Sequence, residues 1–197
     1  MIGDVAGHGP DEAALGVCLR IAWRTLILAN ADPETILASM DSVLVSERDS
    51  DEIFATVSMV RVDASRLTAR FWLAGHPLPV ILDGTVEQVP DEAAGTALGI
   101  VDGATWPGID IPLRNRSSLM LYTDGLIEGY ENPEARDAGG GHRLGENGMQ
   151  RLLTDLLASG LESGPLADAL LAEVQQLNGG ELTDDVAVLL LAWSDRE

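Results

Sequence analysis

The sequence of 197 residues contains no lysine, because all of its 12 basic residues are arginine. The absence of lysine excludes a P-loop lysine, a protein-kinase lysine and any mechanism through a Schiff base. A single cysteine, Cys18, cannot form an internal disulfide, so the composition favours a reducing compartment. Cys18 falls in an apolar stretch, where we expect a buried thiol rather than a nucleophile.

Long apolar runs and a leader sequence are also lacking. No stretch approaches about 18 uninterrupted apolar residues, and the first residues carry no basic region. We therefore expect no membrane span, no signal peptide and a cytoplasmic location. No serine lies in a Gly-x-Ser-x-Gly elbow, which argues against the common hydrolase triads.

Acidic residues dominate the charge, since 32 Asp and Glu against 12 Arg give a net charge of −20. Such a surface repels phosphate backbones, so we expect no nucleic-acid partner. The acidity could serve solubility, or it could attract divalent cations or a basic partner. Composition alone leaves these alternatives open.

The apolar pattern is that of one domain, residues 1–197, with 46% apolar residues and an ordinary core. Helical spacing predicts helices over residues 11–29, 33–47 and 149–157 and after Pro165. Between them the sequence is rich in apolar and β-branched residues. It predicts strands over residues 53–62, 67–74, 80–82, 86–89, 109–113, 119–122 and 186–193.

The order of these elements predicts an α+β domain with helices packed on antiparallel sheets. The last strand, residues 186–193, is nearly all apolar, so we expect it at the centre of a sheet. Residues 131–148 are polar and rich in glycine, which predicts a surface loop.

Three acidic turns carry the functional argument: residues 3–9 (GDVAGHG), 122–125 (YTDG) and 182–186 (LTDDV). Each places a carboxylate, Asp4, Asp124 or Asp184, where an apolar strand-like run meets a turn. Like charges gathered at strand ends repel and raise one another's pKa unless a cation lies between them. Ligands that are all oxygen indicate Mg²⁺ or Mn²⁺ rather than zinc.

Taken together, the motifs resemble a known family. Five motifs occur in the order found in the SpoIIE/RsbU-like branch of the metal-dependent PPM serine/threonine phosphatases, and the resemblance runs from residue 1 to about 193. It implies an αββα sandwich of antiparallel sheets flanked by helices, with two Mn²⁺ or Mg²⁺ ions between the sheets. The motifs are residues 3–9, 74–77 (AGHP), 98–99 (LG), 121–125 (LYTDG) and 183–185 (TDD).

The resemblance also implies a set of site residues. Asp4 would bridge both metals, the backbone carbonyl of Val5 would be a further ligand, and Asp124 and Asp184 would complete the carboxylates of one metal. These three aspartates are the expected catalytic residues, in a direct attack of metal-bound hydroxide on phosphoserine or phosphothreonine without a phosphoenzyme. Whether Asp184 or its neighbour binds directly stays open, and four residues are expected around the ligands: Gly7, His8, Gly125 and Asp185.

The implied substrate is a phosphorylated anti-anti-sigma (STAS-type) protein in a bacterial stress or developmental signalling pathway. An upstream sensor domain would then control the activity. The helices within residues 11–47 carry a wide apolar surface, which fits either a homodimer contact or a buried helix pair.

The chain departs from the family at its start. Relatives carry an earlier strand pair with a Gly-Gly-Asp motif, whereas this chain begins at Met1 inside what would be a later strand. We therefore expect an N-terminally truncated domain, with the first strands missing. Three functions remain open: an active phosphatase, a catalytically inactive phosphatase-fold module that binds a regulatory protein, and a metal-binding structural domain.

Overall fold

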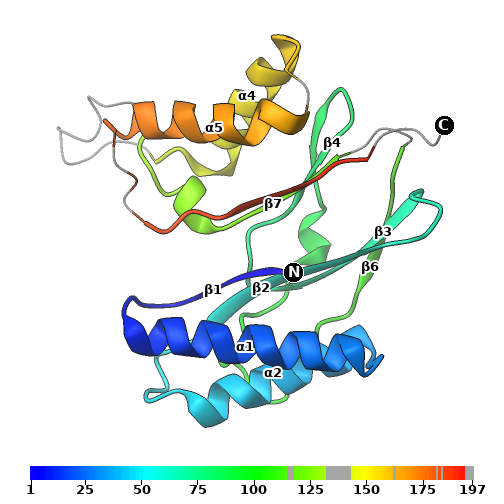
Figure 1. The fold of residues 1–197 in the computed structure, drawn as a ribbon, viewed down its shortest axis with the longest axis vertical. Helices are drawn as coiled ribbons and strands as arrows, with labels where there is room; N and C mark the ends of the chain where they lie inside the picture. Colours follow the sequence, from blue (N-terminus) through cyan, green and yellow to red (C-terminus); the bar gives the residue numbers. More distant parts are fainter. Residues whose placement is uncertain (115–117, 132–142, 162, 181, 183, 194–197) are drawn as a thin grey trace. The chain divides into compact units, whose positions relative to one another are not determined.

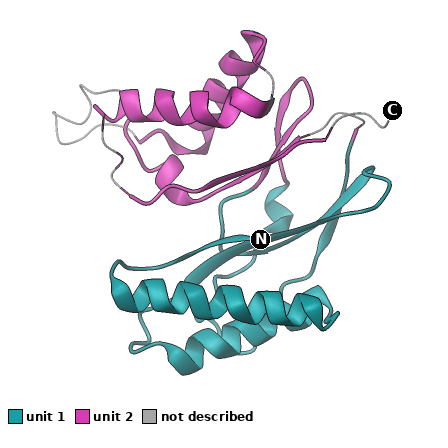
Figure 2. Ribbon diagram, viewed as in Figure 1, with its two compact units in different colours: residues 1–78, 90–113 teal, residues 79–89, 114–197 magenta. Residues whose placement is uncertain are grey.

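The computed structural model describes residues 1–114, 118–131, 143–161, 163–180, 182 and 184–193. The chain divides into two compact units, which Figure 2 colours separately. The first unit comprises residues 1–78 and 90–113, and the second comprises residues 79–89 and 114–197. Within the described residues, each unit contains one antiparallel sheet and two α-helices.

The first unit is built on a four-stranded sheet in the order β1-β2-β3-β6. Helices α1 (Pro10–Leu28) and α2 (Pro33–Glu47) lie together on one face of this sheet (Figure 1). A short 3₁₀ helix, η1 (Asp91–Ala93), precedes the last strand. The strands are β1 (Ile2–Val5), β2 (Ala55–Val62), β3 (Thr68–Ala74) and β6 (Ile109–Pro112).

Local sequence explains where both helices begin. Pro10 occupies the first turn of α1, where its missing N–H costs nothing, and acidic residues follow it toward the positive end of the helix dipole. Asp32 caps α2 by accepting a hydrogen bond of 2.9 Å from the N–H of Thr35. Apolar side chains of both helices pack with the sheet in one core: Leu15, Leu19, Ile36, Leu37, Met40, Leu44, Val57, Met59 and Trp72.

The second unit has its own four-stranded sheet, in the order β5-β4-β7-β8. Helices α4 (Gly145–Ala158) and α5 (Ser163–Leu177) pack with it, and the 3₁₀ helix η2 (Asp124–Leu126) follows β7 closely. The strands are β4 (Val80–Leu82), β5 (Val86–Gln88), β7 (Ser118–Tyr122) and β8 (Val188–Leu191). Their shared core contains Val80, Leu82, Met120, Tyr122, Leu126, Met149, Leu153, Leu166, Leu170 and Val174.

The α+β class, with antiparallel sheets and packed helices, is confirmed. The predicted helices and strands are found within a few residues of their expected bounds. Among the described residues, no helix is both long and apolar enough to cross a membrane.

Three expectations about individual segments are wrong in detail. In the described sheet β8 is the outer strand and is only partly buried, because Val188 and Leu190 pack against the helices of the second unit while the strand pairs with β7 alone. Helix α4 begins at Gly145, so the last residues of the predicted loop are helical, and residues 132–142 of that loop lie outside the described residues. Cys18 is exposed, since the buried side of α1 passes through Leu15 and Leu19.

Candidate functional site

Asp4 lies on β1, the outer strand of the described sheet in the first unit. In the antiparallel register Asp4 stands opposite Thr56 of β2, and Val5 stands opposite Ala55. A Cβ added at Gly3 would come within 2.8 Å of the carbonyl oxygen of Thr56, so β1 approaches β2 more closely than a larger residue allows. The side chain of Asp4 is partly buried. Pairing with the start of β2 sets the position of the Asp4 backbone.

The turn after β1 leads directly into α1. The N–H of Ala6 donates to the carbonyl of Phe54 at 2.9 Å, which extends the pairing with β2 beyond the strand. Gly7 and Gly9 have φ values of 108° and 137°, a region that favours glycine, and α1 starts at Pro10. Gly7 and His8, which we expected around a metal, are both exposed in this turn.

The second motif, residues 74–77, supports β2 from its other side. His76 is 5% exposed, and its Nδ1 lies 2.9 Å from the hydroxyl of Thr56, the residue opposite Asp4. Gly75 has a φ of 66° and lies so close to Ala97 that a side chain there would overlap it. His76 therefore has a structural place in the first unit, next to the strand that positions Asp4.

The third motif, residues 98–99, meets the same place. Leu98 and Ala55 exchange two backbone hydrogen bonds, of 3.1 and 2.8 Å. Ala55 is the residue opposite Val5. The motifs at residues 3–9, 74–77 and 98–99, far apart in sequence, thus converge on the first residues of β2.

A cavity of about 320 Å³ lies beside β1 in the first unit. Its lining is mostly apolar and includes Leu19 and Trp23 of α1 and Met40 of α2, with Asp4 at one side. Arg20 is the basic residue of this lining, but the mostly apolar surface offers a phosphate group few of the other charges or hydrogen-bond donors that it requires.

In the second unit, Asp124 begins η2, two residues beyond the end of β7. The β7–β8 pairing continues past both strands, because the N–H of Thr123 donates to the carbonyl of Ala187 at 3.0 Å. The Thr123 hydroxyl accepts from the N–H of Ala187 at 2.9 Å and donates to the carbonyl of Asp185 at 3.3 Å. Asp124 therefore lies beside the segment that contains Asp184 and Asp185.

Gly125 allows this close approach. A Cβ built on Gly125 would overlap the backbone oxygen of Asp185. Asp184 and Asp185 are both exposed, and the Asp184 carboxylate accepts a hydrogen bond of 2.8 Å from the N–H of Asp185. Which of the two would bind a metal directly stays a prediction.

Tyr122, at the end of β7, does not belong to the acidic cluster. It is fully buried, and burial, followed by the charge of Glu146, raises the pKa of its phenol well above the ordinary value. The phenol therefore stays protonated at every physiological pH and is not available as a general base.

The expected metal ligands divide between the two units. Asp4 and Val5 belong to the first unit, whereas Asp124 and Asp184 belong to the second. The described residues contain no group of three His, Cys, Asp or Glu side chains placed to hold a metal ion. The expected ligand atoms of Asp4, Val5, Asp124 and Asp184 are all oxygen atoms on partly or fully exposed residues, which suits a hard divalent cation.

Sequence reasoning missed the residues that support these carboxylates. Thr123 lies within a recognised motif, but nothing in the sequence marks its hydroxyl as the link to Asp185 and Ala187, 62 and 64 residues away. The contact between Thr56 of β2 and His76, two residues beyond the end of β3, is equally invisible in local sequence. The only sequence signal that could have suggested these roles is that Thr123 and His76 both lie within motifs.

Comparison with known proteins gives a consistent family. Residues 1–194 match the family model of stage II sporulation protein E (SpoIIE). The chain is 22% identical to stage II sporulation protein E of Bacillus subtilis (strain 168) over 166 residues, covering 84% of this chain and 18% of the relative. It is 23% identical over 164 residues to the Priestia megaterium protein of the same name, covering 83% of this chain and 26% of the relative. The chain therefore spans only a minor part of these curated relatives.

Solved structures share the fold over nearly the whole chain. The SiaA-PP2C domain of Pseudomonas aeruginosa has a TM-score of 0.77 at 23% identity, covering 98% of this chain and 73% of that one. The RsbU and RsbW domains of a Mycobacterium tuberculosis protein give 0.75 at 26% identity, covering 99% and 53%. The PP2C phosphatase domain of SpoIIE from B. subtilis, solved with a regulatory fragment, gives 0.74 at 21%, covering 97% and 53%. The resemblance to the SpoIIE/RsbU-like branch is confirmed: the chain belongs to the stage II sporulation protein E family and has the fold of PP2C phosphatase domains.

Proposed function

We propose that this chain is a metal-dependent protein phosphatase domain that hydrolyses phosphoserine or phosphothreonine on a regulatory protein. The observation that carries the proposal is the placement of Asp124 beside the segment of Asp184 and Asp185 by the extended β7–β8 pairing. Asp4, on the strand fixed against β2, supplies the third carboxylate. Membership of the SpoIIE family supports a phosphatase reaction for this acidic set.

The metal site we propose takes ligands from both units. Asp4 and the Val5 carbonyl in the first unit would join Asp124 and Asp184 in the second to hold two Mn²⁺ or Mg²⁺ ions. In support, a structure of the related SpoIIE phosphatase domain from B. subtilis was presoaked with Mn. When bound, such ions lower the pKa of a water molecule and polarise a phosphoryl oxygen.

The protein's own contribution is to hold the carboxylates in place before any ion arrives. Thr123 and Gly125 fix the turn of Asp124 against the backbone of Asp185. The close β1–β2 pairing fixes Asp4 through the backbone. Ligands on strand ends and tight turns lose little conformational entropy when they bind, which favours a preorganised site.

A phosphorylated anti-anti-sigma (STAS-type) protein is the substrate we propose, within a bacterial signalling pathway in the cytoplasm. Two of the similar structures support a regulatory setting: one contains RsbU and RsbW domains, and another belongs to work on the bacterial stressosome, at a TM-score of 0.60 and 20% identity. An upstream sensor domain would set the activity. Exposed apolar side chains on α1, Val17, Ile21 and Leu28, favour a second copy of the chain as a further contact.

A phosphate-release assay tests the activity. The purified chain is given Mn²⁺ and a phosphoserine STAS-type protein, beside the variants Asp124→Asn and Asp155→Asn. Asp155 is an exposed aspartate on α4 and serves as the matched control. We expect release that requires Mn²⁺, is lost in Asp124→Asn and persists in Asp155→Asn. No release from the wild-type chain, together with retained binding of the protein partner, would instead identify an inactive binding module.

A further inference from the structure

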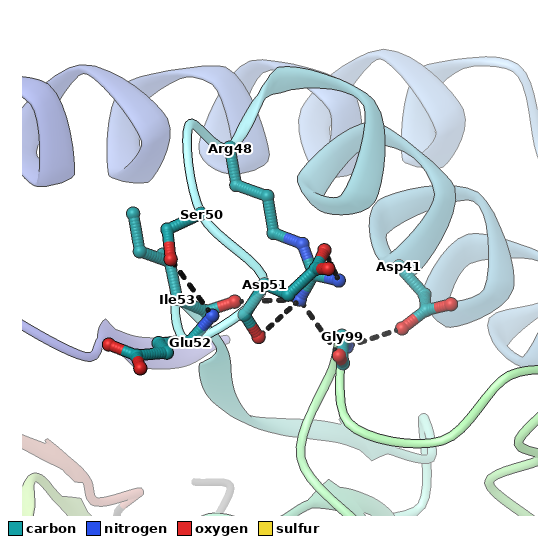
Figure 3. A network of polar contacts seen from close by, with 7 residues as sticks. All are labelled: Asp41, Arg48, Ser50, Asp51, Glu52, Ile53 and Gly99. Carbon is teal, nitrogen blue, oxygen red and sulfur yellow. Dashed lines mark hydrogen bonds and ion pairs between the residues drawn. The ribbon is translucent and has the colours of Figure 1, made fainter.

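Two side chains hold the backbone of Gly99, one at its N–H and one at its carbonyl (Figure 3). One side chain belongs to α2 and the other to the residue that directly follows α2. Arg48 directly follows α2, and its Nη1 donates to the carbonyl oxygens of Gly99 at 2.8 Å and Ile53 at 2.9 Å. Asp41, within α2, accepts a hydrogen bond of 2.6 Å from the N–H of Gly99. We call Asp41, Arg48 and Gly99 the Gly99 clamp.

Arg48 is placed for these carbonyl contacts rather than for charge pairing. Its side chain is 10% exposed, whereas Asp51, which accepts from Nη2 at 3.0 Å, is fully exposed. An ion pair with one partner in solvent contributes little to stability. The planar guanidinium, however, can donate to several acceptors in fixed directions, which an ammonium group cannot reproduce. The contacts with Ile53 and Gly99 therefore account for an arginine at this position.

Gly99 itself is required by the clamp. Its φ is 82°, and an added Cβ would lie 3.0 Å from Nη1 of Arg48 and 3.1 Å from Cδ2 of Leu44. A larger residue would be strained and would push against the guanidinium. This geometry gives a reason for the Leu-Gly motif at residues 98–99, which the carboxylate ligands alone leave unexplained.

The clamp acts on residues beside the start of β2, the strand that pairs with β1. Arg48 holds Ile53, and the following residue, Phe54, accepts the hydrogen bond from the N–H of Ala6. Gly99 follows Leu98, which exchanges two hydrogen bonds with Ala55, the residue opposite Val5. The two residues whose carbonyl groups Arg48 contacts, Ile53 and Gly99, therefore lie next to the backbone that holds Val5 and Ala6 in place.

We propose that Asp41 and Arg48 are positioning residues that set the β1–β2 register and so present Asp4 and Val5 to the metal. The metal part of this inference rests on the proposed function. β1 has only four residues and pairs on one side with β2 in the described sheet, so its position depends strongly on that partner. A displacement of Ile53 or Gly99 would move β2's first residues, and Asp4 with them.

The first test compares Arg48→Lys with a control, Arg24→Lys, in the full chain. Arg24 is an exposed arginine of α1. Hydrogen exchange at the Ala6 amide is measured without metal, and Mn²⁺ affinity is measured by calorimetric titration. We expect Arg48→Lys to accelerate exchange at Ala6 and to raise the Mn²⁺ dissociation constant roughly tenfold or more, as for other residues that orient ligands. Arg24→Lys should change neither quantity. Wild-type values for both quantities in Arg48→Lys would overturn the proposal.

The second test keeps the inference falsifiable if Arg48→Lys fails to fold. Asp41→Asn retains an oxygen acceptor for the Gly99 N–H, whereas Asp41→Ala removes it. We expect Asp41→Asn to behave like the wild-type chain, and Asp41→Ala to show faster exchange at Ala6 and weaker Mn²⁺ binding. Equal behaviour of the two variants would contradict a role for this hydrogen bond.

These measurements also separate the inference from the proposed function. A wild-type chain that binds no Mn²⁺ refutes the proposed metal centre, and with it the presentation of Asp4 to a metal. Exchange at Ala6 is read without any ion, so it decides independently whether the Gly99 clamp sets the β1–β2 register. Normal Mn²⁺ binding in every variant, with altered exchange, would overturn positioning and leave the clamp a structural contact.

Discussion

At the scale of single residues, the turn of Asp124 in the second unit depends on Gly125, which has no side chain, and on the hydroxyl of Thr123. Gly125 lets η2 lie against the backbone of Asp185. Thr123 is 4% exposed and joins the same backbone through hydrogen bonds in both directions. Both residues hold the turn of Asp124 against the backbone of Asp185.

Replacing Gly125 with alanine should destabilise the second unit and weaken Mn²⁺ binding. The added Cβ overlaps the Asp185 carbonyl, and relief requires a backbone shift that costs about 1–3 kcal/mol. Thermal unfolding followed by circular dichroism measures the loss, and Gly164→Ala in α5 is the control, because its added Cβ would meet no atom within 4 Å beyond its chain neighbours and the nearby backbone of its own helix. An unchanged melting temperature in Gly125→Ala would contradict the close approach.

Thr123→Val tests the hydroxyl separately from its shape. Valine has nearly the same volume but leaves the Ala187 N–H and the Asp185 carbonyl without this partner, at a cost of about 1–3 kcal/mol. Thr123→Ser keeps the hydroxyl and should retain most of the stability. Urea unfolding of the three proteins gives the free energies of unfolding. A free energy of unfolding in Thr123→Val equal to that of the wild-type chain would mean that the hydroxyl does not contribute.

Residue types and order were enough to predict the candidate carboxylates, but not what supports them. Asp4, Asp124 and Asp184 stand out because acid, glycine and strand end recur together. The contact of Arg48 with Gly99 spans 51 positions, and no local pattern marks it. Cys18 shows the opposite error, since an apolar neighbourhood predicted burial and the helix turned the thiol outward.

At the scale of elements, α2 has three separate tasks along its length. Asp32 caps its first turn, its apolar side chains pack in the core, and its second half supplies Asp41 to the Gly99 clamp. The Thr35 hydroxyl donates to Asp32 at 2.6 Å, and this bond, with that from the Thr35 N–H, lowers the pKa of the Asp32 carboxyl. The start of α2 should therefore be sensitive to acid.

The sign of this pH dependence follows from the lowered pKa. A carboxyl whose pKa is lower in the folded state adds stability above its ordinary value, about 4, and loses it as the pH falls through the folded value. We expect the difference in melting temperature between the wild-type chain and Asp32→Ala to be largest at pH 7 and to shrink below about pH 4. Asp32→Asn, which keeps an acceptor without charge, is the control. A difference that grows on acidification would contradict the capping role.

Periodicity in the sequence predicted which residues form helices and strands better than it predicted which strands lie side by side. Helical spacing located α1 and α2, and the Asp83–Gly84 signal located the β4–β5 turn. The position of β8 at the outside of its described sheet was not predictable from its apolar composition, because strand order depends on long-range pairing. The start of α4 at Gly145 was missed for a local reason, since glycine lowers helix propensity.

At the scale of the whole molecule, the expected ligands are shared by two compact units. In the proposed metal centre, carboxylates from both units, in a chain of net charge −20, would repel one another in the absence of cations. Bound Mn²⁺ should therefore stabilise the folded chain as well as activate it, since a ligand of the folded state shifts the unfolding equilibrium. The proposed metal centre therefore requires that Asp4 shares ions with Asp124 and Asp184.

Anomalous diffraction from crystals grown with Mn²⁺ tests that claim most directly, because it locates each ion against named oxygen atoms. We predict two peaks about 3.5–4 Å apart, with Asp4 touching both and with Asp124 and Asp184 bound to one of them. Peaks that contact carboxylates of a single unit only, or none of these three aspartates, would contradict the proposed metal centre.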